Sequence, residues 1–243
     1  MNPGPVLVLR PQPGADETVA RLKADGHDAR ALPLLDRRPL PEDAAARRCV
    51  DDLDLFDAIV CVSPAAVSHG LPRITDRWPQ LPLRPRWIAV GDATATTLAR
   101  WDVAAVVPDD ARTEGLLTLE ALADAERVLI VRGRGGREDL AAELAARGQQ
   151  VEHLVVYERV AQRVALPEAA DVSALVATSA EVVDALLASG GQALFGVPLL
   201  VPSARVADHA ARAGFERVTR MHGASPTATA EAIAGLFASD DAS

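Results

Sequence analysis

The segment Val6-Leu7-Val8-Leu9-Arg10 occurs a second time in similar form, as Val128-Leu129-Ile130-Val131-Arg132, at an offset of 122 residues. Each copy continues through a polar turn that contains glycine, an amphipathic helix that ends at glycine, and a second apolar segment. This second segment is 29–35 in one copy and 150–157 in the other. Each copy therefore predicts a strand-helix-strand unit. The residues that match in register are Gly14 with Gly136, Leu22 with Leu144, Gly26 with Gly148, and Arg37 with Arg159.

The remaining parts of the chain also resemble one another. The segment Ala58-Ile59-Val60-Cys61-Val62-Ser63 is similar to Leu175-Val176-Ala177-Thr178-Ser179, and a helical segment follows each, starting near Ala65 and near Ala180. The chain thus consists of two related halves in which apolar strands alternate with helices. This alternation predicts an α/β fold of two doubly wound domains, flavodoxin-like or Rossmann-like, whose parallel sheets carry helices on both faces.

Two segments of extended, β-compatible residues lead into charged residues at equivalent points of the repeat, 33–39 and 156–162. If these two segments pair, they form a two-stranded connector between the domains. One domain then consists of residues 1–36 and 161–243, and the other, 39–157, is inserted between them. The sequence also allows the alternative of a simple division near residue 122.

Composition excludes several classes of protein. Of the 243 residues 49% are hydrophobic, which is enough for one or two buried cores, and the net charge of −9 argues against nucleic-acid binding. The two cysteines, Cys49 and Cys61, form neither a CxxC motif nor a cluster with histidines, so no disulfide framework or zinc site is expected. We expect a reducing, cytoplasmic location, because there is no secretory signal and no apolar run near the roughly 20 residues that span a bilayer.

The residues that follow the apolar strands are candidates for ligand binding, because ligands of open parallel sheets lie beyond the carboxyl ends of the strands. Many of them are hydroxyl residues or glycines, which suit the binding of carboxylates or phosphates. The alternative is that the serines and threonines only cap helices. These residues are Arg10, Ser63, Gly91 to Thr94, Arg132 to Arg137, Thr178, Ser179 and Ser203.

Other motifs are uninformative about catalysis. The stretch Arg132-Gly133-Arg134-Gly135-Gly136-Arg137-Glu138 is neither GxGxxG nor a Walker A sequence, so it predicts an anion-accepting turn or merely solvated arginines. The five histidines lack the spacing of metal ligands, and we assign them no catalytic role. Tyr157, the only tyrosine, ends a strand; its phenol can donate a proton or a hydrogen bond, but a lone strand tyrosine is also typical of simple packing.

An ordered set of short motifs resembles the uroporphyrinogen-III synthase family over nearly the whole chain. The resemblance implies one domain from the middle of the chain, one from both ends, and a two-stranded connector. The motifs are Ser63 after a strand, Val90-Gly91-Asp92-Ala93-Thr94, Glu114-Gly115-Leu116-Leu117, Leu129-Ile130-Val131-Arg132-Gly133, Gly136-Arg137-Glu138, Val156-Tyr157-Glu158, Thr178-Ser179 and Ala224-Ser225-Pro226-Thr227.

This resemblance also implies an activity, that of a cyclising lyase of porphyrin and heme biosynthesis. The family closes hydroxymethylbilane, a linear tetrapyrrole with acetate and propionate side chains, with loss of water and inversion of the last ring, ring D. Neither a metal nor a cofactor takes part, and we expect a monomer whose only partner is this small molecule. The alternative is an inactive ligand-binding or regulatory module of the same fold.

By motif, the family's functional positions correspond to Tyr157 and Thr94 as catalytic residues. We expect Tyr157 to assist departure of the substrate hydroxyl. Together with the residues at the strand ends, the residues expected to bind substrate are Arg10, Ser63, Gly91, Arg132, Gly133, Thr178, Ser179 and Thr227.

Overall fold

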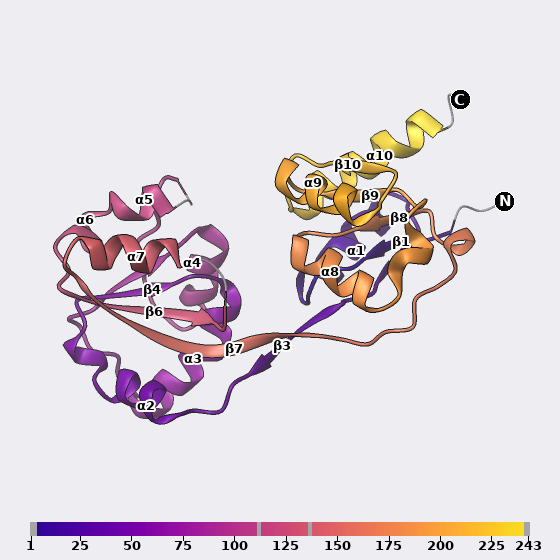
Figure 1. The fold of residues 1–243 in the computed structure, drawn as a ribbon. Coiled ribbons are helices and arrows are strands. Elements are labelled where there is room, and N and C mark those ends of the chain that lie inside the picture. The colour runs from indigo at the N-terminus through magenta and orange to yellow at the C-terminus, as the bar shows by residue number, and fades with distance from the viewer. Residues whose placement is uncertain (1–3, 111–112, 136–137, 241–243) are drawn as a thin grey trace. The chain divides into compact units, whose positions relative to one another are not determined.

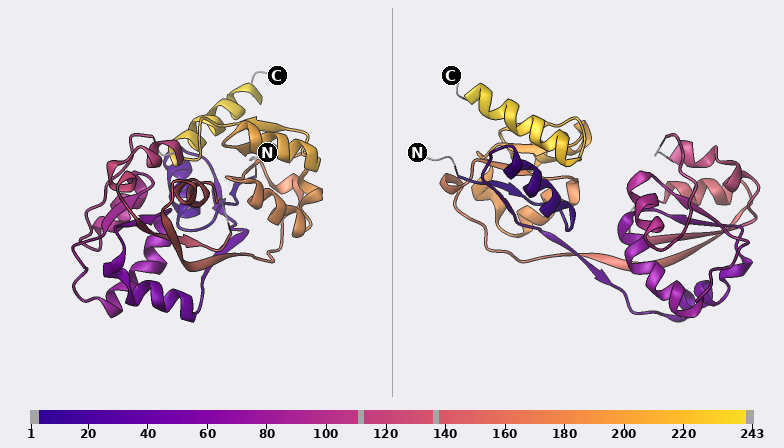
Figure 2. Two further views of the ribbon diagram at one scale, coloured as in Figure 1. Left: turned by 60° about the vertical axis from the view of Figure 1, so that its left-hand side comes forward. Right: turned by 180° about the vertical axis from the view of Figure 1, so that it is seen from behind.

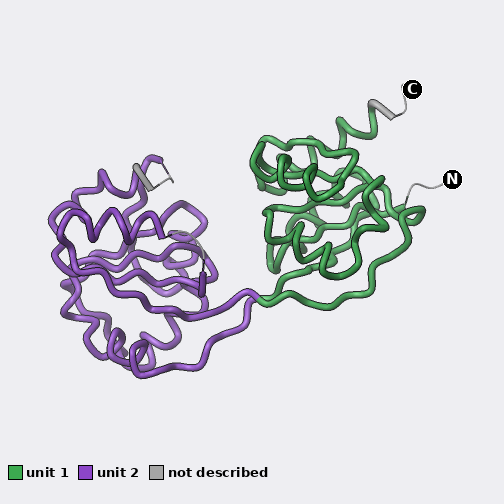
Figure 3. The backbone as a smooth tube through the Cα atoms, viewed as in Figure 1, with its two compact units in different colours: residues 1–36, 160–243 green, residues 37–159 purple. Residues whose placement is uncertain are grey.

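The computed structural model describes residues 4–110, 113–135 and 138–240 (Figure 1). The chain divides into two compact units, unit 1 from residues 1–36 and 160–243 and unit 2 from residues 37–159 (Figure 3). The segments expected from the sequence, 1–36 with 161–243 and 39–157, lie inside these units. Among the described residues, no helix is both long enough and apolar enough to cross a bilayer.

Unit 1 is a five-stranded sheet in the order β10-β9-β8-β1-β2, in which every neighbouring pair is parallel. Its strands are β1 (Val6–Val8), β2 (Ala29–Ala31), β8 (Ala174–Val176), β9 (Leu199–Val201) and β10 (Val218–Arg220). Its helices are α1 (Gly14–Ala24), α8 (Ala180–Ala188), α9 (Ala204–Ala213) and α10 (Pro226–Asp240), with short 3-10 turns at Ala169–Asp171 and Gly191–Leu194.

Side chains of unit 1 alternate between two apolar layers, because successive strand residues point to opposite faces. Val6 and Val8 pack with residues of α1 and α10 on one face. Leu7 and Leu9 pack with residues of α8 and α9 on the other face. Helices α1 and α10 lie side by side although they come from opposite ends of the chain (Figure 2). Unit 1 is therefore a three-layer α/β/α unit.

Unit 2 has the strand order β3-β7-β6-β4-β5. Ile59 and Cys61 pack beneath α2 and α3, whereas Ala58 and Val60 face α7. Its strands are β3 (Leu35–Pro39), β4 (Ala58–Cys61), β5 (Arg86–Ala89), β6 (Arg127–Gly133) and β7 (Gln150–Ala161). Its helices are α2 (Ala44–Asp51), α3 (Pro64–Arg77), α4 (Asp92–Ala99), α5 (Thr113–Leu117), α6 (Glu120–Ala123) and α7 (Asp139–Ala146), with a 3-10 turn at Leu53–Leu55.

The sequence repeat has a direct counterpart in the topology of the two sheets. The repeat matches β1 with β6, β2 with β7, and β8 with β4. The order β2-β1-β8-β9 of unit 1 corresponds strand by strand to the order β7-β6-β4-β5 of unit 2. Beside β5, where unit 1 has β10, a parallel bridge joins Ile88 to Val106. The prediction of two related doubly wound halves is confirmed.

The segment 29–35, expected as one strand, is divided in the structure, so that prediction is wrong. Strand β2 ends at Ala31 and belongs to the sheet of unit 1, whereas β3 begins at Leu35 and belongs to the sheet of unit 2. Pro33 lies in the break and has no N–H group to donate to a neighbouring strand. The equivalent segment of the second copy has no proline and continues as the long strand β7.

Strands β3 and β7 form the two-stranded connector. The Leu40 amide donates to the Val156 carbonyl at 3.0 Å, and the Gln162 amide donates to the Leu34 carbonyl at 2.8 Å. From the first hydrogen bond to the second, the residue number falls from 40 to 34 on one strand and rises from 156 to 162 on the other. The pair is therefore antiparallel. The chain passes between the units at residues 36–37 and 159–160 and not near residue 122.

Asp57 joins three strands at the amino-terminal edge of the sheet in unit 2. Its carboxylate accepts hydrogen bonds from the amides of Glu126 (3.0 Å) and Arg127 (2.9 Å) and from Arg84 Nη2 (2.8 Å). The hydrogen bond from the Arg127 amide is the largest cause that lowers the Asp57 pKa below its usual 3.8. We expect Asp57→Ala to lower the free energy of unfolding by about 1–2 kcal/mol at pH 7, because the exposed Glu126 amide and the part-buried Arg127 amide lose a charged acceptor.

The pH dependence of this effect follows from the depressed pKa of the folded state. The stabilisation is complete above the unfolded-state pKa and is lost as the pH falls through the lower folded-state value. Urea unfolding, followed by the fluorescence of the three tryptophans, reports unit 2, because Trp78, Trp87 and Trp101 all lie there. The control is Asp54→Ala, which removes an exposed carboxylate and should leave the stability unchanged. Equal stability of wild type and Asp57→Ala at pH 7 would contradict the prediction.

Candidate functional site

The strand orders locate a switch point in each sheet, where neighbouring strands lead to helices on opposite faces. In doubly wound folds, ligands bind at this point beyond the carboxyl ends of the strands. The switch point of unit 1 lies between β1 and β8, and that of unit 2 lies between β6 and β4. Arg10 follows β1 and Thr178 follows β8. Ser63 follows β4, and Gly133 ends β6.

The register of the strands aligns these candidate residues. Val8 pairs with Val176, so Arg10 and Thr178 lie at the same level, each two residues further on. In unit 2, Cys61 pairs with Val131, which aligns Ser63 with Gly133 in the same way. The structure therefore brings Arg10 close to Thr178 in unit 1, and Ser63 close to Gly133 in unit 2.

In unit 1, Arg10 braces the loop that precedes α10. Its Nη1 donates to the Ala224 carbonyl at 2.8 Å and to Thr18 Oγ1 at 3.3 Å. A Cβ on Gly14 would lie 2.7 Å from Arg10 Nε, so glycine makes room for the guanidinium group. Thr227 is exposed in the first turn of α10, where its hydroxyl accepts from Arg21 Nη1 at 3.3 Å. Arg10 thus supports the segment that presents Thr227.

Helix capping accounts for part of the serine pattern. Ser63 Oγ accepts from the Ala66 amide at 3.1 Å, and Ser179 Oγ accepts from the Val182 amide at 3.3 Å. Ser203 caps α9 in the same way, through the Val206 amide. Capping uses each hydroxyl as an acceptor, so its proton is still available for donation. Capping and ligand binding are therefore compatible roles for Ser63 and Ser179.

Gly91 and Thr94 shape the start of α4. Gly91 precedes the helix with an extended backbone, and its carbonyl accepts from the Thr94 amide at 3.0 Å. Thr94 is only 2% exposed. Thr94 therefore belongs to the buried part of unit 2 in this structure, and its predicted catalytic role remains a prediction.

Tyr157 packs its ring in the apolar core beneath α3 and is 4% exposed. Its Oη lies 3.4 Å from Ser63 Oγ, at the switch point. The ring rests on Gly133, because a Cβ there would lie 2.5 Å from Tyr157 Cζ. The backbone carbonyl of Tyr157 accepts from the Arg134 amide at 2.7 Å. The ring is thus packed in the core, while the hydroxyl contacts a polar partner. These contacts are compatible both with a packed aromatic residue and with a hydroxyl that donates a proton or a hydrogen bond.

His69 lies against Tyr157, a contact that the spacing of the histidines in the sequence does not predict. The two ring centroids are 5.4 Å apart, and the ring planes are inclined by 33°. His69 follows Ser63 by six residues on α3, less than two helical turns. This spacing was the only sign in the sequence that His69 could lie near Ser63 and the candidate site. It identifies His69 only when the packing of α3 over β6 and β7 is known.

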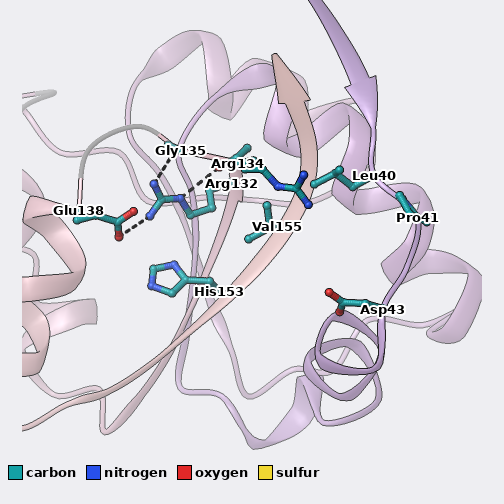
Figure 4. Close-up of a pocket in the computed structure, with 10 residues that line it drawn as sticks. Leu40, Pro41, Asp43, Arg132, Arg134, Gly135, Glu138, His153 and Val155 are labelled. Carbon is teal, nitrogen blue, oxygen red and sulfur yellow. Dashed lines mark hydrogen bonds and ion pairs between the residues drawn. The ribbon is translucent and has the colours of Figure 1, made fainter. Parts of the chain in front are cut away.

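A pocket of about 380 Å³ lies on the other face of β7 (Figure 4). His153 and Val155 line it and alternate with Leu154 and Val156, which pack on the Tyr157 side. Burial is the largest cause that lowers the pKa of His153, and the positive charge of Arg132 lowers it further. The negative charge of Glu138 partly offsets this decrease. The full lining is Leu40, Pro41, Asp43, Arg132, Gly133, Arg134, Gly135, Glu138, His153 and Val155.

Arg132 is 7% exposed and is held within this turn. Its guanidinium group donates to Glu138 Oε2 at 2.8 Å and to the Gly135 carbonyl at 2.6 Å (Figure 4). Gly136 and Arg137 of the same motif lie outside the described residues. The side chains of Arg132 and Tyr157 therefore lie on opposite faces of the sheet, although their backbones are close to each other at the carboxyl ends of β6 and β7. In the part of the chain that the structure describes, no group of three potential metal ligands occurs.

Together, the repeated three-layer units and their polar switch points define a two-domain, doubly wound α/β protein of the kind that binds ligands at the carboxyl ends of its strands. The family model described as uroporphyrinogen-III synthase HemD matches residues 16–233. The chain belongs to the uroporphyrinogen-III synthase family, whose members are cyclising lyases of tetrapyrrole synthesis.

Individual relatives agree with this assignment. Uroporphyrinogen-III synthase of Salmonella typhimurium is 32% identical over 232 residues, covering 88% of this chain and 93% of the relative. The Escherichia coli protein of the same name is 32% identical over 194 residues, covering 74% and 78%.

Solved structures share the fold. The Helicobacter pylori uroporphyrinogen-III synthetase aligns over 96% of this chain and 99% of its own, with a TM-score of 0.63 and 16% identity. A mutant uroporphyrinogen III synthase from Thermus thermophilus aligns over 99% and 100%, with a TM-score of 0.61 and 17% identity. The two-domain α/β fold is therefore that of the family.

Proposed function

We propose that the chain acts as a uroporphyrinogen-III synthase, which closes hydroxymethylbilane with loss of water and inversion of ring D. The observation that carries the proposal is the match to the family over residues 16–233, which includes the switch point of unit 2 and strand β8 of unit 1. The Salmonella typhimurium relative matches a similar share of the chain, 88%. The reaction belongs to porphyrin and heme biosynthesis.

Binding of the substrate carboxylates is assigned to the switch points. Ser63 and Ser179 begin α3 and α8, where helix amides and hydroxyl groups offer several donors for an anion. Such donors hold carboxylates without a large positive potential, which suits a chain with a net charge of −9. Arg10 and Arg132 add local positive charge, although both already have partners within the chain.

Tyr157 is assigned to the departure of the substrate hydroxyl. Ser63 Oγ already accepts from the Ala66 amide, so its own proton can point to Tyr157 Oη. The phenol proton is then available for the leaving hydroxyl, which departs as water and leaves an azafulvenium ion. The substituted carbon of ring D attacks this ion, and the spiro intermediate fragments and recloses with the ring inverted. The proton that is lost on closure balances the one given by the phenol and restores it.

Positioning contributes more than acid strength in this proposal. Hydroxymethylbilane closes without help to the symmetric isomer, so the protein must hold the conformation that leads to the inverted product. Gly91 and Thr94 are assigned to this task through the start of α4, with Gly133, Thr178 and Thr227 as further binding positions.

The proposal also includes the oligomeric state and the location of the protein, which are a monomer and the cytoplasm. The free thiols of Cys49 and Cys61 are buried, and burial raises their pKa to about 11 and about 12. Thiols of this kind remain protonated and unreactive, which is compatible with a reducing compartment. Sedimentation equilibrium is expected to give the mass of one chain, 25.6 kDa.

The decisive experiment supplies freshly prepared hydroxymethylbilane to the full chain and separates the oxidised product isomers. We expect the isomer with ring D inverted to predominate, and the symmetric isomer to predominate without protein. Formation of only the symmetric isomer at the rate without protein would overturn the enzymatic assignment. Tight binding of the substrate in that case would favour the inactive ligand-binding module.

A further inference from the structure

Helix α3 contacts the single tyrosine at two points along its length. Ser63, which caps the helix, lies 3.4 Å from the hydroxyl oxygen, and His69 packs its ring 5.4 Å from the ring of Tyr157. From the sheet, Gly133 approaches so closely that only a glycine fits beneath the phenol. The phenol is therefore located by contacts from both the helix layer and the sheet.

We propose that His69 is a positioning residue for Tyr157, whose neutral imidazole ring holds the phenol over Gly133 with its hydroxyl at Ser63. This inference rests on the proposed function, because it concerns the group assigned to the departure of the substrate hydroxyl. His69 acts through Tyr157 and is not assigned any contact with the substrate.

The charges around His69 favour its neutral form. Burial is the largest cause that lowers the pKa of His69, followed by the charges of Arg73 and Arg37. Arg73 lies one turn further along α3, on the same side of the helix, and Arg37 lies on β3. Tyr157 on β7 is a further titratable group that contacts His69. Protonation would place a third positive charge beside two arginines.

Arg73 cannot readily move away from a protonated His69. One guanidinium nitrogen, Nη2, donates both to the Leu40 carbonyl and to the Val156 carbonyl, the latter at 3.1 Å. These two carbonyls belong to the paired segments of β3 and β7, which form the connector. The arginine is therefore anchored, and repulsion is relieved by displacement of the His69 ring. That displacement removes the packing that locates Tyr157.

The test with the strongest readout uses the one tyrosine of the chain. Protein labelled with ¹³C in its tyrosine ring gives a single set of ring signals. We expect these signals to shift as the pH falls from about 8 to about 5, with the midpoint below the usual His value near 6.5. His69→Phe keeps a ring but cannot be protonated, so the shift should be absent. Signals in wild type that do not respond to pH would overturn the proposal.

Steady-state kinetics provide the second readout. We expect His69→Ala to lower kcat about tenfold with little change in KM, because a poorly placed catalytic group slows the reaction more than it weakens binding. His69→Phe should recover most of the lost turnover and flatten the acid side of the pH profile. His209→Gln, on α9 in unit 1, is the control and should retain the wild-type profile.

The two readouts separate this inference from the proposed function. A wild type that forms only the symmetric isomer disproves the function, whereas the tyrosine signals still report whether His69 and Tyr157 are coupled. If His69→Ala does not fold, as judged by tryptophan fluorescence, the pH titration of wild type still decides. Wild-type kcat in His69→Ala, or a pH profile of His69→Phe that matches wild type, would overturn the positioning role.

Discussion

Tyr157→Phe is expected to lower kcat for the inverted isomer by about 10²-fold, at the lower end of the range for general-acid catalysis. The variant removes the hydroxyl at 3.4 Å from Ser63 Oγ and leaves the packed ring in place. A larger effect is not expected, because the electron-rich pyrrole already activates the leaving hydroxyl. Initial rates and the isomer ratio, measured with fresh substrate, test the prediction.

The control for Tyr157→Phe is Ser189→Ala, which removes a hydroxyl at the end of α8, where it donates to the Ala185 carbonyl. Both variants should retain the wild-type tryptophan fluorescence and unfold cooperatively. Wild-type turnover and an unchanged isomer ratio in Tyr157→Phe would reduce Tyr157 to a packed aromatic residue. Thr94 or a bound water would then be the next candidate for assisting the leaving hydroxyl.

Gly133→Ala should lower kcat by about 10²-fold or more, because a small misplacement of a catalytic group has an effect of that size. The added Cβ would lie 2.5 Å from Tyr157 Cζ and 2.7 Å from Cε2, so the phenol must move. The ring is buried beneath α3, and its displacement strains the core. We expect the free energy of unfolding to fall by about 1–3 kcal/mol.

A matched control for this variant is Gly196→Ala, because a Cβ there meets nothing nearer than Glu216 Oε2 at 4.0 Å. It should behave as wild type. Gly133→Ala combined with Tyr157→Phe should lose less activity than the product of the two separate losses, because both act through one hydroxyl. Fully multiplicative losses, or wild-type kcat in Gly133→Ala alone, would show that Gly133 does not position the phenol.

Much of the fold was predictable from the sequence, for physical reasons that particular elements illustrate. The run 128–131 is apolar because β6 is buried on both faces, and its match to 6–9 predicted an equivalent strand in the other half. Once the strands are parallel, the residues after them must collect at one edge. Arg10 and Thr178, and likewise Ser63 and Gly133, could therefore be grouped without a structure.

Other features depend on packing that local sequence patterns encode weakly or not at all. The separation of β2 from β3 has a local signal in Pro33, but the apolar residues around it favour a single strand. The position of His69 depends on how α3 is rotated about its own axis above the sheet. The burial of Thr94 depends on how α4 packs. The direction of Arg132, toward Glu138 and away from Tyr157, follows from strand alternation combined with a tight turn.

The pairing of β1 with β8 has a consequence for the order in which the chain acquires its structure during synthesis. Residues 37–159 are continuous, so the inserted sheet can form as soon as its strands have left the ribosome. Val6, in contrast, has Ala174 as its partner on β8, and α1 packs against α10 at the far end of the chain. Until β8 is made, β1 has only β2 as a neighbouring strand, and its face toward α8 and α9 is uncovered. Damage to the late segments, by truncation or premature termination, should thus affect the beginning of the chain before it affects the middle.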